Sequence, residues 1–224
     1  MHRILESELM EGYEQVKAYA EADFSEPNHR FIEFVSSSIS PYFSGKALDL
    51  GCGPGDISYR FAKQFPESTI DAIDGSKPML DYAAKRLTLE LSGQINYIHA
   101  RIPFATAFSG PYDVVFSNSL LHHLSDPQVL WQTVKTCAGK QTPIVVMDLL
   151  RPESESAANL LVNEYAANEP DILKHDFYHS LLAAFTLDEI RLQLSYAQMN
   201  LAVEQISNRH VLITGKINIT THNE

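Results

Sequence analysis

Three glycines follow a short apolar run and precede an acidic residue, a pattern that can bind a ligand through the backbone alone. The run Ala47–Leu50 leads into Gly51, Gly53 and Gly55, and Asp56 follows directly. Glycine lets a backbone approach a ligand closely, and the helix that such a turn opens presents free N–H groups. The spacing predicts a strand, a ligand-binding turn and a helix, although glycine turns also occur for structural reasons alone.

A second acid, Asp74, indicates what kind of ligand the turn takes. A dinucleotide-binding turn has a third glycine where this chain has Asp56, whose negative charge suits a pyrophosphate poorly. Asp74 ends the second predicted strand, 23 residues after Gly51, where a carboxylate can accept hydrogen bonds from a ribose diol. The two acids favour a ribose-containing ligand with positive charge, and they disfavour an NAD-dependent oxidoreductase.

Two histidine pairs are candidates for proton transfer or metal binding. His122 and His123 follow the fourth predicted strand, at the edge of the sheet where active crevices form. Either is a candidate general base, with packing as the alternative role. His175 and His179 have the spacing of zinc ligands on a helix, but no third ligand is apparent and the apolar stripe of that helix faces the other way. We therefore expect no metal site.

Tyrosines outside the glycine turn are candidates for a substrate pocket. Tyr13 and Tyr19 lie in the first predicted helix, and Tyr178 lies beside His179. Aromatic residues at helical spacing pack in the core more often than they bind substrate, so both roles stay open.

The chain has only two cysteines, Cys52 and Cys137. Two are too few for a disulfide framework or a four-cysteine zinc site. Cys52 lies in the glycine turn, but no histidine is nearby in the sequence, so we do not predict a nucleophile there.

Short apolar runs alternate with amphipathic helices from residue 46 onward. The predicted strands are residues 47–50, 69–73, 95–98, 112–116, 144–147, 201–205 and 211–216. The last two flank a short polar turn that is typical of a hairpin. The alternation predicts an α/β fold with a seven-stranded, mostly parallel sheet, helices on both faces and an antiparallel C-terminal hairpin.

Two helical segments lie outside this alternation. Residues 1–43 are predicted to form an N-terminal helical cap, and residues 153–185 a helical lid inserted into the domain of residues 44–217; residues 218–224 are a tail. Thr186 and Glu189 have the spacing of a capping box that restarts a helix. Because neither segment is needed to cover the sheet, we expect residues 1–19 and 168–185 to be mobile and to become ordered when ligands bind.

The charge balance limits the partners. The chain has 17 Lys and Arg against 28 Asp and Glu, a net charge of -11. Nucleic acids and anionic membranes are bound largely through basic residues, so we expect neither as a partner. No apolar stretch approaches the roughly 18 residues of a membrane span, and the N-terminus lacks an apolar leader region. We expect a cytoplasmic protein, whose oligomeric state stays open.

Together these motifs resemble the class I S-adenosylmethionine-dependent methyltransferases over residues 46–216. The resemblance rests on the turn LDLGCGPG at residues 48–55, on Asp74 and on the run DVVFSNSLLHHL at residues 113–124. It implies a Rossmann-like fold with S-adenosylmethionine as cofactor and S-adenosylhomocysteine as product. The cofactor-binding residues that it implies are Asp49, Gly51, Cys52 and Gly53 at the turn, Asp74 at the ribose, Gly75, Ser76 and Met79 at the adenine, and Asn118 and Ser119 at the cleft floor.

The chain departs from the family pattern after the third strand. Many members have an acid there that binds the adenine amino group, whereas this chain has Ala100, Arg101 and Ile102. We therefore expect the adenine to contact the backbone of residues 100–102. The side chain of Arg101 then either turns elsewhere or is a solvated surface charge.

The resemblance favours an enzyme that methylates a small molecule by in-line displacement. Holding the acceptor and the methyl group in line supplies much of such catalysis, so a general base helps but is not obligatory. A DNA or RNA methyltransferase is less favoured, because residues 117–120 read Ser-Asn-Ser-Leu rather than the Asn/Asp-Pro-Pro-aromatic motif of base-methylating enzymes. A non-catalytic protein that binds the cofactor for regulation or assembly is a further alternative.

Overall fold

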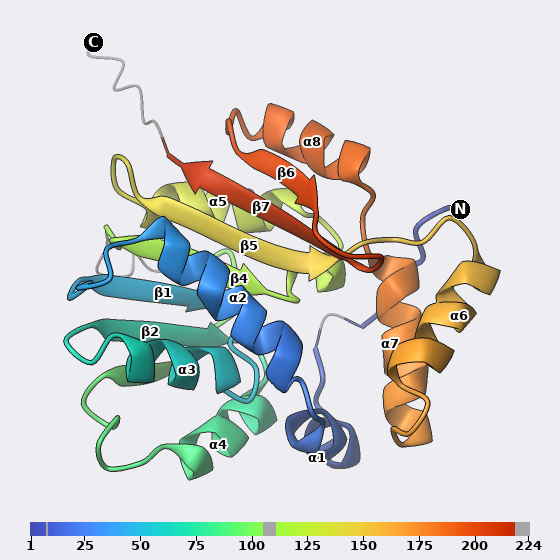
Figure 1. Cartoon of the computed structure of the whole chain (residues 1–224), viewed down its shortest axis with the longest axis horizontal. Helices are drawn as coiled ribbons and strands as arrows, with labels where there is room; N and C mark the ends of the chain where they lie inside the picture. The colour runs from blue at the N-terminus through green and yellow to red at the C-terminus, as the bar shows by residue number, and fades with distance from the viewer. Residues whose placement is uncertain (8, 105–110, 218–224) are drawn as a thin grey trace.

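The computed structural model describes residues 1–7, 9–104 and 111–217, and its centre is one mixed sheet (Figure 1). The strands that it describes run in the order β3-β2-β1-β4-β5-β7-β6. They are β1 Lys46–Leu50, β2 Thr69–Asp74, β3 Ile95–His99, β4 Val114–Asn118, β5 Pro143–Leu149, β6 Ala202–Gln205 and β7 His210–Lys216. Strands β1 to β5 pair in parallel, whereas β7 pairs antiparallel with both β5 and β6. The predicted sheet and its C-terminal hairpin are confirmed.

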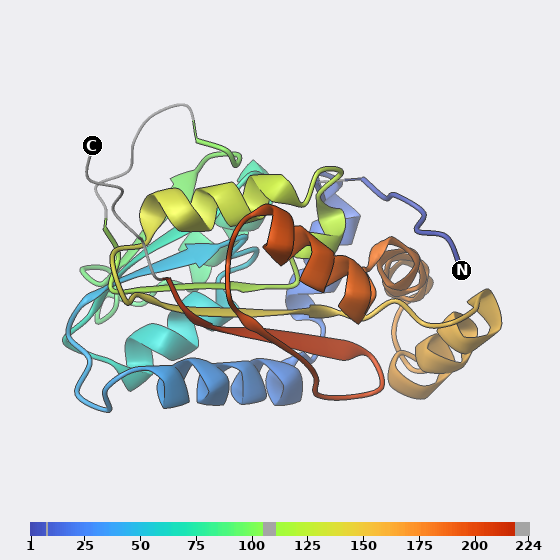
Figure 2. The ribbon, with the colours of Figure 1, turned by 90° about the horizontal axis from the view of Figure 1, so that it is seen from above.

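Helices cover both faces of this sheet (Figure 2). On one face, α2 Ser25–Ser38, α3 Asp56–Gln64 and α4 Lys77–Arg86 contribute Phe31, Phe61 and Leu80 to one apolar cluster. On the other, α5 Gln128–Cys137 and α8 Leu187–Tyr196 pack around the fully buried Trp131. Strands β1 and β4 lie in the middle with both faces buried, which explains their nearly unbroken apolar runs.

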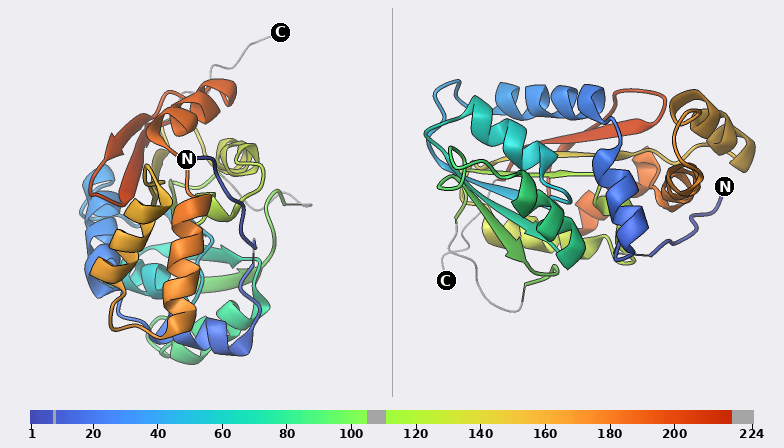
Figure 3. Two further views of the ribbon diagram at one scale, coloured as in Figure 1. Left: turned by 90° about the vertical axis from the view of Figure 1, so that its right-hand side faces the viewer. Right: turned by 90° about the horizontal axis from the view of Figure 1, so that it is seen from below.

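Three more helices lie beyond the carboxyl ends of the parallel strands: α1 Tyr13–Glu21, α6 Glu155–Tyr165 and α7 Asp171–Ala183 (Figure 1). Helices α6 and α7 pack on each other around Ala158 and Leu181. Residues 1–7, 9 and 10, which we call the N-terminal strap, run alongside α7 toward α1 (Figure 3, left).

The strap is not helical, which corrects the prediction of a cap that is helical throughout residues 1–43. Its polar groups are bound by distant parts of the chain instead. Arg3 donates from Nη2 to the carbonyl oxygens of His122 and Leu124, both at 2.8 Å, and its guanidinium lies 3.9 Å from the ring centre of Phe185. The N–H of Ile4 donates to the Leu182 carbonyl at 3.0 Å. Tertiary contacts here replace the hydrogen bonds of a helix.

Two local predictions have different outcomes. Strand β4 begins at Val114 rather than at Tyr112, because Tyr112 makes only a single bridge with Ala138. The capping box is confirmed, since Thr186 Oγ1 accepts from the N–H of Glu189 at 3.3 Å and Glu189 returns a carboxylate oxygen to the N–H of Thr186 at 2.8 Å. No helix in the described part of the chain is long and apolar enough to cross a membrane.

Candidate active site

The turn after β1 depends on glycines in the left-handed region. Gly53 and Gly55 have φ angles of 53° and 81°, which favour glycine over other residues. A side chain at Gly55 would also overlap the hydroxyl group of Tyr97. Gly55 is the N-cap residue of α3, so the turn joins the end of β1 to a helix as the sequence predicts.

Asp74, at the end of β2, fastens this turn to the next one. Its Oδ2 accepts from the N–H of Gly53 at 2.8 Å, and its Oδ1 accepts from the N–H of Ser76 at 2.7 Å. Ser76 in turn donates its hydroxyl to the Met10 carbonyl of the strap at 2.5 Å. Burial raises the pKa of Asp74, while the two backbone hydrogen bonds oppose that shift. The carboxylate therefore organises two loops before any ligand arrives.

Asp49, the penultimate residue of β1, is a second carboxyl group beside the glycine turn. It is buried and accepts a hydrogen bond from the Ser58 hydroxyl at 2.6 Å. Burial raises its pKa to about 7; the Ser58 hydrogen bond opposes this shift and the charge of Asp74 adds to it. A positively charged ligand nearby would stabilise the ionised form of Asp49.

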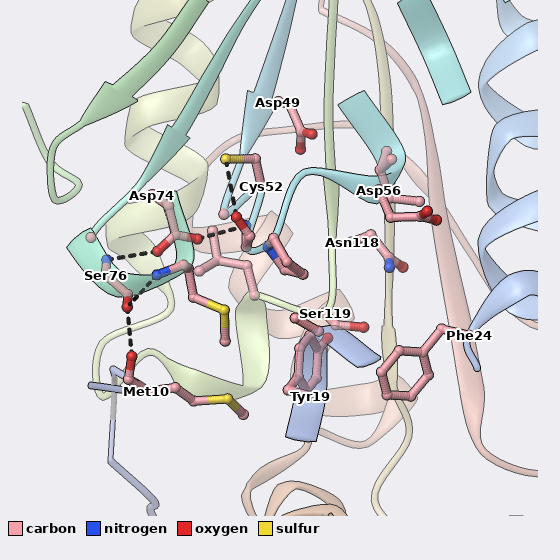
Figure 4. Close-up of a pocket in the computed structure, with 18 of the residues that line it drawn as sticks. Met10, Tyr19, Phe24, Asp49, Cys52, Asp56, Asp74, Ser76, Asn118 and Ser119 are labelled. Atoms are coloured by element: carbon pink, nitrogen blue, oxygen red, sulfur yellow. Dashed lines mark hydrogen bonds between the residues drawn. The ribbon is translucent and has the colours of Figure 1, made fainter. Parts of the chain in front are cut away.

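These residues line a pocket of about 450 Å³ at the carboxyl ends of β1 to β4 (Figure 4). The lining includes all of the residues that we expect to bind the cofactor: Asp49, Gly51, Cys52, Gly53, Asp74, Gly75, Ser76, Met79, Ala100, Arg101, Ile102, Asn118 and Ser119. The amide oxygen of Asn118 is buried and has no hydrogen-bond partner among the described residues. Because an unpaired buried acceptor costs free energy, this oxygen suits a ligand that donates a hydrogen bond.

The acceptors in the pocket fit S-adenosylmethionine. The cofactor carries a ribose diol, an ammonium group and a sulfonium group, and the pocket offers two carboxyl groups and the Asn118 amide oxygen. In this arrangement Asp74 would hold the ribose, while Asp49 and Asn118 would face the methionine part. Cys52 is buried, and burial raises the pKa of its thiol, so the thiol supplies packing rather than a thiolate.

The two predicted base candidates occupy different environments. His123 lines the pocket, and burial together with the charge of His122 lowers its pKa to about 3. His122 is only 3% exposed and does not belong to the pocket lining; its Nδ1 lies 2.6 Å from Asp148 Oδ1. Burial opposes protonation of His122, but Asp148 and Glu6 raise its pKa above the ordinary value. A base role for either histidine stays a prediction, and only His123 reaches the pocket.

The predicted substrate residues separate in the same way. Tyr19 lines the pocket, and burial with the charge of Asp74 raises its pKa to about 12. Tyr13, six residues earlier on α1, is 73% exposed. Tyr178 packs on the α6–α7 cluster, and the His179 ring lies 4.3 Å from that of His175. The structure therefore brings only Tyr19 of these four to the pocket.

Sequence reasoning missed several pocket residues, among them Leu9, Met10 and Phe24. No local pattern marks them, because they reach the pocket through the path of the strap and the entry to α2. Asp56 is paired with two basic side chains, which corrects its predicted role: it accepts from Arg60 Nε at 2.6 Å, and its Oδ1 lies 3.8 Å from Arg86 Nη2. Its charge is compensated, so it does not itself repel an anionic ligand.

Comparisons with known proteins agree with this geometry. A methyltransferase-domain family matches residues 47–139. Over 123 residues the chain is 32% identical to the ubiquinone biosynthesis O-methyltransferase of Escherichia fergusonii, and this alignment covers 52% of this chain and 48% of that protein. Over 90 residues it is 32% identical to ribosomal RNA small subunit methyltransferase C of Escherichia coli, which covers 40% of this chain and 25% of that protein. The chain thus spans half or less of these relatives.

The fold is shared more widely than the sequence. A SAM-dependent methyltransferase from Aquifex aeolicus superposes with a TM-score of 0.69 at 15% identity, over 93% of this chain and all of the other. By its domain match, its fold and the sequence of its glycine turn, the chain belongs to the class I S-adenosylmethionine-dependent methyltransferase superfamily.

Proposed function

We propose that the protein transfers the methyl group of S-adenosylmethionine to a small-molecule acceptor. The observation that carries this proposal is that residues outside the sheet and its covering helices also line the pocket. Leu9 and Met10 of the strap, Tyr19 of α1 and Phe24 line the same pocket as the glycine turn, although none of them is needed to cover the sheet (Figure 4). A pocket bordered by these side chains, with a volume of about 450 Å³, suits an acceptor of limited size.

The residues of the chain contribute mainly by positioning. The bound cofactor supplies a methyl group on a sulfonium, which is already activated for displacement. Asp74 and Asn118 would bind two ends of the cofactor, and Tyr19 with Phe24 would limit the orientations of an acceptor. Positioning of this kind can supply about 7 to 11 kcal/mol of a reaction barrier.

A strong general base is not required by this arrangement. His123 is the predicted base that reaches the pocket, and its pKa of about 3 makes it a weak proton acceptor at neutral pH. The proposal therefore favours an acceptor that is nucleophilic without deprotonation by the enzyme, or one whose proton leaves to water.

An RNA substrate is the second reading, since one relative is a ribosomal RNA methyltransferase. That similarity covers 90 residues, which is 40% of this chain and a quarter of the relative, and is no longer than the methyltransferase-domain match of residues 47–139. The chain has 28 acidic and 17 basic residues, and this net negative charge leaves little attraction for a phosphate backbone. Both points support the small-molecule proposal.

The test is transfer of a labelled methyl group from S-adenosylmethionine. The protein is incubated with a low-molecular-weight metabolite extract in one arm and with total RNA in the other, and Asp74→Ala serves as the inactive control. We expect label in the metabolite arm alone. Label in RNA would contradict the proposed acceptor class. Tight binding of S-adenosylhomocysteine without transfer in either arm would favour the non-catalytic alternative.

A further inference from the structure

Three side chains that are far apart in the sequence meet beside the pocket. Glu6 comes from the strap, and His122 and His123 come from the short 3-10 helix Leu121–His123 that follows β4. One ligand atom from each lies within 4.8 Å of the other two. Of the three, His123 also lines the cofactor pocket, so the cluster adjoins that site.

Two of the three distances between these ligand atoms are close to those of metal ligands, and the third is within 4.8 Å. Glu6 Oε1 lies 3.1 Å from His123 Nδ1 and 3.5 Å from His122 Nε2. Zinc bound tetrahedrally at 2.0 to 2.1 Å holds its ligand atoms about 3.3 to 3.4 Å apart. The two imidazole rings lie with centres 4.2 Å apart and planes inclined by 36°.

The carboxylate oxygen at the centre of the cluster has no hydrogen bond. Glu6 Oε1 is buried and lacks a hydrogen-bond partner among the described residues, although it lies next to two imidazole nitrogens. The other oxygen, Oε2, accepts from the Ser180 hydroxyl at 3.1 Å. One oxygen is therefore oriented by α7, while the other stays available, as in a carboxylate that binds a metal through one atom.

The His122 side chain is also oriented to bind a metal ion. His122 uses Nδ1 toward Asp148 Oδ1 at 2.6 Å, which leaves Nε2 to face Glu6. The other Asp148 oxygen accepts from the N–H of Leu121 at 2.7 Å, so the carboxylate is itself held in place. A carboxylate that orients a histidine through the ring nitrogen away from the metal is a common outer layer of zinc sites.

We propose that Glu6, His122 and His123 bind one divalent metal ion, with Zn²⁺ the best match to two imidazoles and a carboxylate. Asp148 and Ser180 orient the ligands. Three protein ligands leave a fourth position for water or another donor. Because Glu6 belongs to the strap, the ion would fasten the strap to the end of β4 at the edge of the cofactor pocket. The sequence alone suggested no such site, because its third ligand lies more than a hundred residues from the histidines.

The metal-free alternative is a proton in place of the ion. In that case a protonated His122 lies between the carboxylates of Asp148 and Glu6, and a proton on His123 Nδ1 is shared between Glu6 and the Ser7 carbonyl, 3.4 Å away. The nearby Arg3 is already engaged by backbone carbonyls. The two alternatives differ in whether the chain takes up zinc, which can be measured without any methyl acceptor.

The experiment is a zinc titration of chelator-treated protein in competition with a chromophoric chelator, followed by cobalt(II) substitution and visible spectroscopy. We expect one equivalent of zinc, with an affinity that Glu6→Gln and His123→Gln each lower at least tenfold. Glu33→Gln is the matched control, because Glu33 lies 3.5 Å from His29 on the exposed face of α2 and should leave zinc affinity unchanged. The cobalt spectrum should change with Glu6→Gln and not with Glu33→Gln.

Other results would overturn the proposal. Absence of stoichiometric zinc binding would assign the cluster to the protonated alternative. Equal affinity in Glu6→Gln and the parent chain, or loss of binding on His175→Gln, would place the ion elsewhere. Circular dichroism and S-adenosylhomocysteine binding of each variant separate loss of the metal from loss of the fold. Because zinc binding and cofactor binding are measured separately, failure of one does not decide the other.

Discussion

The glycine turn and the N-terminal strap meet at one pocket but are held in different ways. The turn is fixed by its own backbone and by one carboxylate, Asp74, from the adjacent strand. The strap has no regular structure. It is held by the carbonyls of His122 and Leu124, at the short helix after β4, and by Ser180 and Ala183 of α7. The difference indicates that the glycine turn is positioned by nearby sequence, whereas the strap that also lines the pocket is positioned by distant segments.

The largest effect is expected from Asp74→Ala, which tests the cofactor end. The substitution removes the acceptor that we propose for the ribose and also releases the N–H groups of Gly53 and Ser76. We expect the affinity for S-adenosylhomocysteine to fall by about 2 to 4 kcal/mol, measured by calorimetry. Asp81→Ala, on the exposed face of α4, is the control. An unchanged dissociation constant for Asp74→Ala would remove this residue from the cofactor site.

A second prediction concerns pH and Asp49. Since its pKa in the folded chain is about 7, affinity for positively charged S-adenosylmethionine should rise up to about tenfold between pH 6 and 8 as the carboxyl group ionises. Asp49→Asn should flatten this profile. S-adenosylhomocysteine, which lacks the sulfonium charge, should show a weaker dependence. A profile that is equally steep in the variant would assign the titration to another group.

Asp49→Asn should weaken cofactor binding at high pH but should stabilise the ligand-free folded chain there. A carboxyl group whose pKa is raised by folding destabilises the folded state as pH rises from about 4 through 7, because the unfolded chain ionises more readily. Without ligand, Asp49→Asn should therefore be more stable than the parent at pH 8, by about 1 to 3 kcal/mol in urea unfolding. At pH 4 the two should be nearly equal.

A smaller effect tests the strap. Arg3→Met keeps an apolar stem over Phe185 but removes the donors for the carbonyls of Ala183, His122 and Leu124. We expect the free energy of unfolding to fall by about 1 to 2 kcal/mol. Hydrogen exchange should accelerate in residues 1–7 and in α7 while the central strands stay protected. Equal acceleration throughout the sheet would mean that the strap is part of the core rather than a separately held cover.

The smallest effects compare two tyrosines of one helix. Tyr19→Phe removes a buried hydroxyl at the pocket and should raise the KM for the acceptor about two- to fivefold. Tyr13→Phe changes an exposed side chain and should leave KM and stability unchanged within error. A rise in KM for Tyr13→Phe would restore the sequence prediction that both tyrosines line the acceptor pocket.

The parts of this molecule that the sequence predicts are those governed by short-range rules. Gly53 and Asp74 follow from the strand–turn–helix pattern and Asp49 from the family resemblance, and the structure places all three around one pocket. The path of the strap does not follow from any pattern, because its helical appearance is overruled by contacts about 120 to 180 residues away along the chain. The partner of His122 was not predicted either, because Asp148 lies inside β5, in an otherwise apolar run.

The strap residues and their hydrogen-bond partners are far apart along the chain, which also affects the order in which the parts of the molecule can assemble. Strands β1 to β3 pair with near neighbours in the chain and can form early, whereas Arg3 must find the Ala183 carbonyl, 180 residues later. At a synthesis rate of about 5 to 20 residues per second, this partner leaves the ribosome roughly 10 to 40 s after Arg3. The first residues to be made would then be the last to dock, so a nascent chain would have its glycine turn before it has a closed pocket.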